Sequence, residues 1–353
     1  MDIQKLVKIT AVICCFTYFI FQITTLSKPR KIVNFEQELK NVYDQVTPIQ
    51  EEGNRTVLLK KRLPDALIIG VMKGGTSMLQ NFIFIHPDVK GLGKGEINFF
   101  SNLFYKGTSW YFSMLEAAGD DEIVMEKSLY FHNAFASRRI RKTYGKKIKL
   151  ILIVKDPVER LLSQYAMMIH YRQTRQSFSQ LVFKKVNGTL AVNTASKPVL
   201  TGNYADQMKI WLSSGFDLDN FLIIDGHKYA KDPWPELVKL ENFLGLRHML
   251  PKDMFYLNET KGFHCVMPNF TFVDGTPSNH EGGCGPARCG RKHEILTEEE
   301  RNLLYQFYAP KNQEFFTMVD MEFPDWDIHK LNGLNETVLQ KKWKQLKDLI
   351  DFN

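Results

Sequence analysis

The chain has 353 residues, of which 44% are hydrophobic and 12% aromatic, enough to bury one large core or two modest ones. Charged residues make up 24% and the net charge is +7, which favours an anionic partner. Composition does not choose among nucleic acid, lipid and acidic polysaccharide, and ordinary surface lysines would give the same excess.

The N-terminal segment from Ile9 to Ser27 contains no charged residue, and lysine or arginine residues flank it on both sides. Its length is just enough to cross a thin bilayer, roughly 27 Å of hydrocarbon, and no A-x-A-like cleavage site follows it. We predict a cytoplasmic tail over residues 1–8 and an uncleaved signal anchor over 9–27, with a cleaved signal peptide as the alternative. The flanking charges do not fix the orientation.

Glycosylation signals and cysteines indicate the cellular compartment of the remainder of the chain. Five N-x-S/T sequons, more than we expect in a cytosolic chain, predict glycans at Asn54, Asn187, Asn258, Asn269 and Asn335.

Two of the five cysteines, Cys14 and Cys15, lie in the apolar segment, which leaves Cys265, Cys284 and Cys289. A closely spaced pair with one more cysteine fits a disulfide in an oxidising compartment. A zinc site is the weaker interpretation because paired C-x-x-C units are missing. We therefore expect the globular part in the lumen of the secretory pathway.

Residues 28–60 are polar and predict a stem between the membrane and the domain. From Pro64 onward, strand-like and helix-like segments alternate, which predicts an α/β fold with a parallel sheet and covering helices. In such sheets ligands bind at the carboxyl ends of the strands. The expected strands are Ala66–Val71, Ile123–Glu126, Lys149–Lys155 and Asn220–Asp225, and the expected helices are Ser77–Ile85, Phe135–Tyr144, Val158–Tyr171, Tyr204–Ser213 and Pro235–Leu244.

The stretch from Leu63 to Leu79 combines a short apolar strand, a glycine turn at Lys73 to Gly75 and a helix that opens with Thr76 and Ser77. This layout points backbone N–H groups and the positive end of a helix dipole at an anion. The stretch departs from the nucleotide-binding frame G-x-x-x-x-G-K-S/T, because Thr76 stands where the lysine belongs. An ordinary glycine turn is the alternative.

The next two segments each contain a carboxylate that is a candidate site residue. Glu96 comes just before the run Asn98 to Phe100, so a cleft with limited water would suit it to general-base work; a plain loop carboxylate is the alternative. The second carboxylate, Glu126, is followed by Lys127 and Ser128 at the end of a predicted strand.

Lys155 ends another predicted strand, and Ser163 lies two turns into the helix that follows. Together they could grip one phosphate group, whereas the alternative is a capped helix whose lysine faces water. Further on, residues 284–293 concentrate glycine and basic residues and predict a cationic lid, with a solvated basic loop as the alternative. The tail at 327–353 predicts an amphipathic helix that packs on the domain or, alternatively, binds a partner.

Taken together, these motifs resemble the secretory-pathway heparan sulfate sulfotransferases, most closely the glucosamine 3-O-sulfotransferases, over residues 61–326. The match runs in order from Lys61-Arg62-Leu63-Pro64 and the Lys73 loop, through Glu96-Ile97-Asn98-Phe99-Phe100 and Lys155-Asp156-Pro157, to the segment from Phe255 to Cys265. The resemblance implies a P-loop-like sulfotransferase domain behind a Golgi membrane anchor, with its catalytic part in the lumen.

The resemblance also implies the chemistry: a sulfuryl group passes from 3′-phosphoadenosine 5′-phosphosulfate (PAPS) to a heparan sulfate chain, with no metal and no nucleic-acid partner. By this resemblance the catalytic residues are Glu96 as general base, Lys73 and Lys127. The implied donor-binding residues are Lys73, Gly74, Gly75, Thr76, Ser77, Lys155, Ser163, Cys289, Gly290, Arg291, Lys292 and His293. The implied acceptor-binding residues are Glu96, Asn98, Lys127, Ser128 and Trp211, and the implied disulfide joins Cys265 to Cys284.

The chain departs from the family's usual residues at several of these positions. Ser77 replaces an arginine, Asn98 and Ser101 replace a histidine and an aspartate, Lys155 replaces an arginine, and Cys289 replaces a lysine. Two alternatives to an active 3-O-sulfotransferase therefore stand. One is a heparan sulfate N-sulfotransferase, and the other is a polysaccharide-binding membrane protein that has lost turnover.

Overall fold

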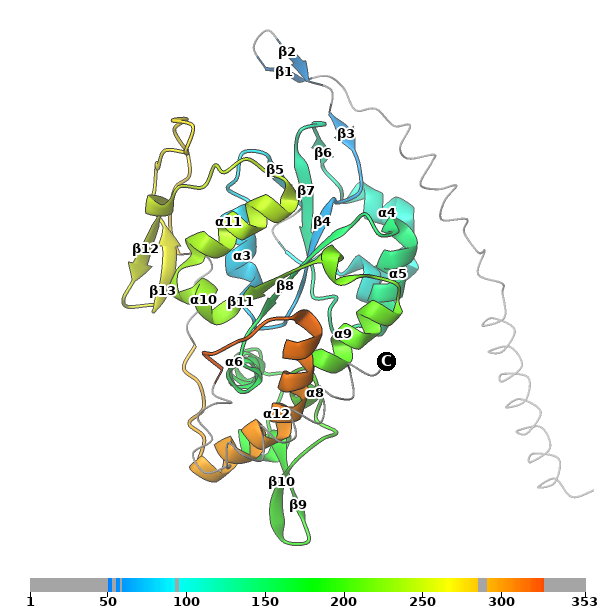
Figure 1. Cartoon of the computed structure of the whole chain (residues 1–353), viewed down its shortest axis with the longest axis vertical. Coiled ribbons are helices and arrows are strands. Elements are labelled where there is room, and N and C mark those ends of the chain that lie inside the picture. The colour runs from blue at the N-terminus through cyan, green and yellow to red at the C-terminus, as the bar shows by residue number, and fades with distance from the viewer. Residues whose placement is uncertain (1–49, 53–54, 58, 93–94, 285–290, 327–353) are drawn as a thin grey trace, which may run out of the picture. The chain divides into compact units, whose positions relative to one another are not determined.

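The computed structural model describes residues 50–52, 55–57, 59–92, 95–284 and 291–326, all within the compact unit Val46–Asn353 (Figure 1). The predicted cytoplasmic tail, signal anchor, most of the stem and the C-terminal amphipathic helix lie outside these residues, as do Asn54, Asn335, Cys289 and Gly290. In the part of the chain that is described, no helix is both long enough and apolar enough to span a bilayer.

A five-stranded parallel sheet forms the centre, with the strand order β11-β8-β4-β7-β5. The strands are β4 (Ala66–Gly70), β5 (Val89–Gly91), β7 (Ile123–Lys127), β8 (Lys149–Val154) and β11 (Phe221–Asp225). Every residue of β4 is buried, as expected for a central strand covered on both faces. Because β4 and β8 are neighbours whose connections leave in opposite directions, the chain reverses its winding at β4, and ligands bind at such switch points.

Helices cover both faces of this sheet, as Figure 1 shows. On one face α3 (Thr76–Ile83), α10 (Gly226–Lys231) and α11 (Pro233–Leu244) pack on alternate strand residues such as Ile68 and Ile153. On the other face lie α4 (Thr108–Ser113), α5 (Ala134–Tyr144) and α9 (Tyr204–Ser213). Trp211 of α9 is buried here, and its indole N–H donates to the carbonyl of Phe131.

A second apolar cluster lies beyond the sheet. Its elements are α6 (Pro157–His170), α7 (Phe178–Val182), the hairpin β9 (Phe183–Val186) and β10 (Thr189–Val192), α8 (Lys197–Leu200) and α12 (Glu298–Val319). Shorter elements complete the fold. These are β1 (Gln50–Glu52), β2 (Arg55–Val57), β3 (Lys60–Lys61), η1 (Phe99–Leu103), η2 (Phe104–Lys106), β6 (Ala117–Ala118), η3 (Leu218–Asn220), η4 (Lys252–Met254), β12 (Phe255–Asn258) and β13 (Phe263–Val266).

The predicted strands and helices are present with end shifts of one or two residues, and α9 has the predicted bounds. Two further elements were not predicted: β5, whose three residues are too few for a periodic pattern, and α12, which contains Pro310. The sulfurs of Cys265 and Cys284 are bonded at 2.09 Å, which is the pairing that the family resemblance implies.

Candidate active site

The loop between β4 and α3 forms the middle of the site. Lys73 adopts a left-handed backbone with φ of 70°, and Gly75 caps α3 with φ of 118°. A Cβ atom on Gly74 would lie 2.4 Å from the carbonyl oxygen of Ile153, so only glycine fits against β8 there. The N–H groups of Met78 and Leu79 already donate to the carbonyl of Gly75, at 3.0 and 3.1 Å. The N–H groups of Thr76 and Ser77, which precede them, are the ones that can face an anion.

The end of β8 supplies positive charge on one side of this loop. Lys155 follows the last strand residue, and Asp156 caps α6 by accepting from the N–H groups of Val158 and Glu159 at 2.8 and 3.0 Å. Nearby, His227 is the second residue of α10, and its pKa is lowered first by burial and then by the charge of Lys155. This side is therefore cationic and holds its histidine neutral.

A second histidine, His293, lies near the same charges. Burial, Lys155 and Lys73 each lower the pKa of His293, while Glu159, 4.0 Å away, opposes them. The two lysines, which come from different strand ends, thus both act on one imidazole. Arg291 has a buried Nε atom with no hydrogen-bond partner in the described part of the chain.

A carboxylate and an ammonium group meet on the opposite side of the loop. The Nζ of Lys127, at the end of β7, lies 2.9 Å from Oε1 of Glu96. The Lys127 side chain is 6% exposed, and that of Glu96 is 30% exposed, so the carboxylate faces solvent while its partner is held by the protein. The side-chain amide of Asn98 also approaches Glu96, at 3.5 Å. This pair can accept a proton and stabilise negative charge.

A buried carboxylate supports the Glu96 loop from behind. Glu126 is 0% exposed and accepts hydrogen bonds from the hydroxyls of Tyr111, Tyr130 (2.5 Å) and Ser128 (2.7 Å). The Ser128 hydroxyl in turn accepts the backbone N–H of Asn98 at 2.9 Å. Burial raises the pKa of Glu126, and its hydroxyl donors oppose the shift. This network fixes the backbone two residues after Glu96.

A histidine contacts the start of the β4–α3 loop. The Nε2 atom of His132 accepts the N–H of Met72, next to Lys73, at 3.4 Å. Burial and the charge of Arg160 lower the pKa of His132 to about 3, so the ring stays neutral and keeps its acceptor.

The structure gathers most of the residues that the sequence analysis selected. Lys73, Gly74, Gly75 and Thr76 form the central loop, with Lys155 and His293 on one side and Glu96, Lys127 and Asn98 on the other. The guanidinium of Arg291 instead lies 5.6 Å from the ring of Tyr171, at the C-terminal end of α6, so its contact with the donor stays a prediction. Ser77 is exposed in the first turn of α3, and Ser163 is half-buried on α6. The role of Ser163, like that of the exposed Lys292, stays a prediction.

Two predicted acceptor contacts are wrong. Trp211 is 0% exposed and its N–H is used inside the core, so no part of its ring is available to an acceptor. Ser128 is also 0% exposed, and its hydroxyl links Glu126 to the Asn98 backbone. Both side chains shape the site from within.

Three features of the site were not predicted from the sequence: the buried position of Glu126 at the centre of a hydrogen-bond network, and the contributions of His132 and His227. A histidine shows no spacing signal by itself, but His132 and His227 each follow a predicted strand end within about six residues, the region where such sheets place ligands. For Glu126, a carboxylate inside a predicted buried strand was the available signal.

Comparison with known proteins gives the class. The family model of the sulfotransferase domain matches residues 63–316. The crystal structure of a sulfotransferase from Alicyclobacillus acidocaldarius aligns with a TM-score of 0.55 at 18% identity, covering 75% of this chain and 99% of that one, which shows a shared fold. The molecule is a sulfotransferase in its architecture.

Proteins of similar sequence identify the family within this class. Heparan sulfate glucosamine 3-O-sulfotransferase 3A1 of Mus musculus is 35% identical, over 78% of this chain and 68% of the relative. Heparan sulfate glucosamine 3-O-sulfotransferase 6 of Homo sapiens is 36% identical, over 75% of this chain and 74% of the relative. The chain belongs to the heparan sulfate glucosamine 3-O-sulfotransferase family.

Sulfotransferases take PAPS as the sulfuryl donor, and the residues present fit such a group. The β4–α3 loop offers a close backbone approach at Gly74. His227 and His293, whose pKa values burial and the charge of Lys155 lower, lie beside that lysine, where a bound anion would balance the charge. Within the described residues, no group of three histidine, cysteine, aspartate or glutamate side chains is placed to hold a metal ion.

Proposed function

We propose that this protein transfers a sulfuryl group from PAPS to the 3-hydroxyl of glucosamine residues in heparan sulfate. The observation that carries the proposal is the Glu96–Lys127 pair, 2.9 Å apart, on the strand edge that also bears the β4–α3 loop. A base and an anion cradle at one edge are what in-line transfer to a hydroxyl requires. The names of the relatives support the choice of acceptor.

The chain's own residues divide the work. Glu96 takes the proton from the acceptor hydroxyl, and Lys127 holds the carboxylate and faces the transferred group. Lys73 and the N–H groups at the start of α3 stabilise the charge left on the departing phosphate. Lys155, Arg291 and His293 hold the other phosphate of the donor, which supplies the sulfuryl group when bound.

We further propose that the protein is an uncleaved type II Golgi membrane protein with this domain in the lumen. The apolar segment from Ile9 to Ser27 supports this, and so do the sequons. Of the described sequons, Asn187 and Asn269 are exposed and open to a glycan. Asn258 is half-buried, and its amide donates to Sγ of Cys284 at 3.4 Å, which makes it the poorer acceptor.

The test is to incubate the purified full chain with radiolabelled donor and N-sulfated heparan sulfate, then map the label. We expect it on the glucosamine 3-hydroxyl. Label on the glucosamine nitrogen, with N-desulfated heparan sulfate as acceptor, would instead favour an N-sulfotransferase. Donor binding without any transfer would contradict the enzymatic proposal and favour a protein that only binds polysaccharide.

A further inference from the structure

A dense run of positive charge lies outside the active site. Residues 138–149 contain seven lysines and arginines and no acidic residue. This run occupies most of α5 and the turn that leads into β8. None of the site residues named above belongs to it.

The exposed members of the run lie along the outer face of α5 and on the turn that follows it. The helix buries Ala136, Ser137 and Ile140 against the fold. Arg138 and Lys142, four residues apart, therefore share the outer face. Beyond the helix, Lys146 and Lys147 are exposed and Lys149 is half-buried. We name Arg138, Lys142, Lys146, Lys147 and Lys149 the basic track.

The track begins beside the active site. Helix α5 starts directly after Asn133, which caps it, at the carboxyl end of β7. Arg139 donates from Nη1 to the carbonyls of Phe100 and Ser101 at 2.8 and 3.0 Å, which ties the helix to the segment that follows Glu96. Phe135, 66% exposed, lies in the first turn of α5.

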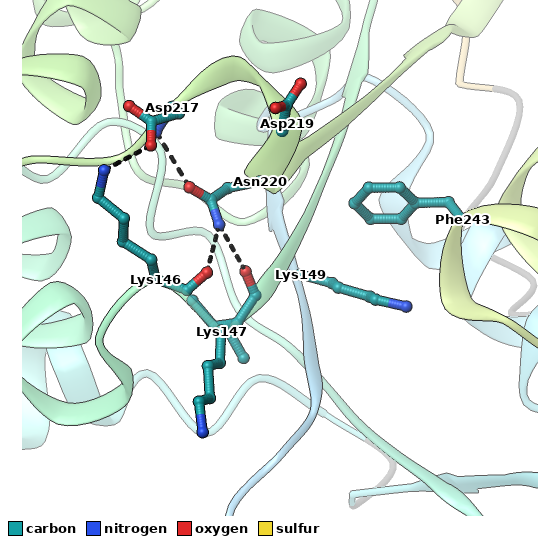
Figure 2. A pocket seen from close by; sticks show the side chains of 8 residues that line it. Lys146, Lys147, Lys149, Asp217, Asp219, Asn220 and Phe243 are labelled. Atoms are coloured by element: carbon teal, nitrogen blue, oxygen red, sulfur yellow. Dashed lines mark hydrogen bonds and ion pairs between the residues drawn. The ribbon is translucent and has the colours of Figure 1, made fainter.

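The track ends at the opposite edge of the sheet. Because α5 connects the carboxyl end of β7 to the amino end of β8, it runs back along the sheet for roughly 16 Å. The three lysines at its far end line a pocket of about 450 Å³ (Figure 2).

The floor of this pocket is fixed by hydrogen bonds. The side-chain amide of Asn220 donates to the carbonyls of Lys146 (2.7 Å) and Ile148 (3.4 Å), and the Asn220 carbonyl oxygen accepts the N–H of Asp217 at 3.0 Å. The turn that presents the lysines is therefore held in one shape, and Lys149 lies 5.7 Å from the centre of the Phe243 ring.

Charge in and around the pocket is not balanced. Asp217 pairs with Lys146 at 2.6 Å, and Asp219 also lines the pocket. Lys147 and Lys149 have no carboxylate partner among the described residues, and the same holds for Arg138 and Lys142 on the helix. Four cations are thus left to an external anion.

We propose that the basic track is a second binding surface for the acidic polysaccharide, which holds one part of the chain while another part occupies the active site. This inference rests on the proposed function, because it takes heparan sulfate as the acceptor. The surface is a line of separated charges that starts at the catalytic edge, which suits an extended polyanion. Lipid and nucleic acid are disfavoured because α5 presents one exposed aromatic ring, Phe135, next to the track, and the track itself has no apolar face or stacking platform.

The experiment compares two purified full-length variants that remove the same charge. R138A/K142A/K147A removes three side chains of the track, and K184A/K185A/K197A removes three exposed lysines elsewhere. Each is assayed for donor-dependent transfer to long N-sulfated heparan sulfate and to a hexasaccharide. We expect the track variant alone to raise KM for the long chain by roughly tenfold, the loss expected for three exposed charge contacts. Its kcat and its KM for the hexasaccharide should match the control.

Equal KM values for the two variants on long chains would overturn the proposal. If the wild type transfers nothing to either acceptor, the proposed function fails, and retention on immobilised heparan sulfate without donor then decides the track separately. Elution of the track variant at lower salt than the control supports it, whereas identical elution refutes it. Track-dependent binding to a phosphatidylserine vesicle or an oligonucleotide that is tighter than binding to heparan sulfate would also overturn the choice of partner.

Discussion

At the scale of single residues, a solvent-facing carboxylate is aligned by groups that are themselves buried. Lys127 contacts Glu96 directly, and Ser128 holds the Asn98 backbone through its own bond to Glu126. Adjacent residues of one strand end thus act on the proposed base from two directions. Side chains with no access to ligand therefore control its position.

The Glu126 network gives the first prediction. Glu126→Ala leaves three hydroxyls without their acceptor, and each unsatisfied group costs about 1–3 kcal/mol, so we expect the free energy of unfolding to fall by about 3 kcal/mol or more. Glu126→Gln keeps one acceptor oxygen and should cost much less. Urea denaturation measures both variants.

Because the network acts through the Asn98 backbone, Glu126→Gln should also lower kcat while donor affinity stays unchanged. The donor Kd, measured by calorimetry, is the internal control. A variant with wild-type kcat would show that Glu126 has only a structural role.

His132 gives a prediction on pH. Its folded pKa of about 3 lies below the ordinary value of 6.5, so the unfolded chain takes up a proton first as the pH falls. This contribution to stability is complete above pH 6.5 and is lost toward pH 3, at up to about 1.4 kcal/mol per pH unit. His132→Gln should flatten the fall of stability over this window.

The measurement is the urea midpoint of wild type and of His132→Gln between pH 7 and pH 4. The carboxylates titrate in both proteins, so their contribution cancels in the difference between the two midpoints. Exposed His170→Gln is the matched control and should follow the wild type. Parallel curves for His132→Gln and wild type would contradict the assignment of a neutral, buried imidazole.

At the scale of elements, the shape of the β4–α3 loop depends on how closely the loop packs against β8. The Gly74 position has no room for a side chain because the Ile153 carbonyl lies across from it. The neighbouring Gly226 is restricted in the same way, by the carbonyls of Val154 and Gly74. Two glycines from different connections thus pack the ends of β4, β8 and β11 together.

Gly74→Ala should force the loop away from β8 and weaken donor binding by more than about tenfold, with a loss of about 1–3 kcal/mol in stability. Donor affinity by calorimetry and the melting temperature check this. Gly95→Ala serves as the control for stability, since a Cβ atom there meets nothing within 4 Å. Unchanged donor affinity in Gly74→Ala would mean that the loop does not bind the donor.

The elements differ in how far the sequence predicts them. β4 and β8 are buried apolar runs bounded by Lys-Gly-Gly and Lys-Asp-Pro, so pattern and turn chemistry agree. β5 has three residues, too few to be predicted from its own sequence, and it is a strand because it pairs with β7. The π-helical turn η1 begins directly after Asn98, whose backbone is left-handed, and no hydrophobic periodicity predicts such a turn.

At the scale of the whole molecule, the site is assembled from strand ends that are far apart in the chain. Order along the sequence was enough to predict which residues share the edge of a parallel sheet, because every strand of the sheet presents its carboxyl end there. Burial was harder to predict. Trp211 and Ser128 are internal because α9 and the Glu126 network cover them, and both depend on contacts between distant segments.

The most direct test of the account is transfer by Glu96→Gln, which keeps the shape of the side chain and removes its basicity. We predict that wild type labels N-sulfated heparan sulfate from radiolabelled PAPS. Glu96→Gln should be slower by roughly a hundredfold or more with unchanged donor affinity, whereas exposed Glu259→Gln should behave as wild type. Transfer at the wild-type rate by Glu96→Gln would show that Glu96 is not the base and would contradict the mechanism proposed for this site.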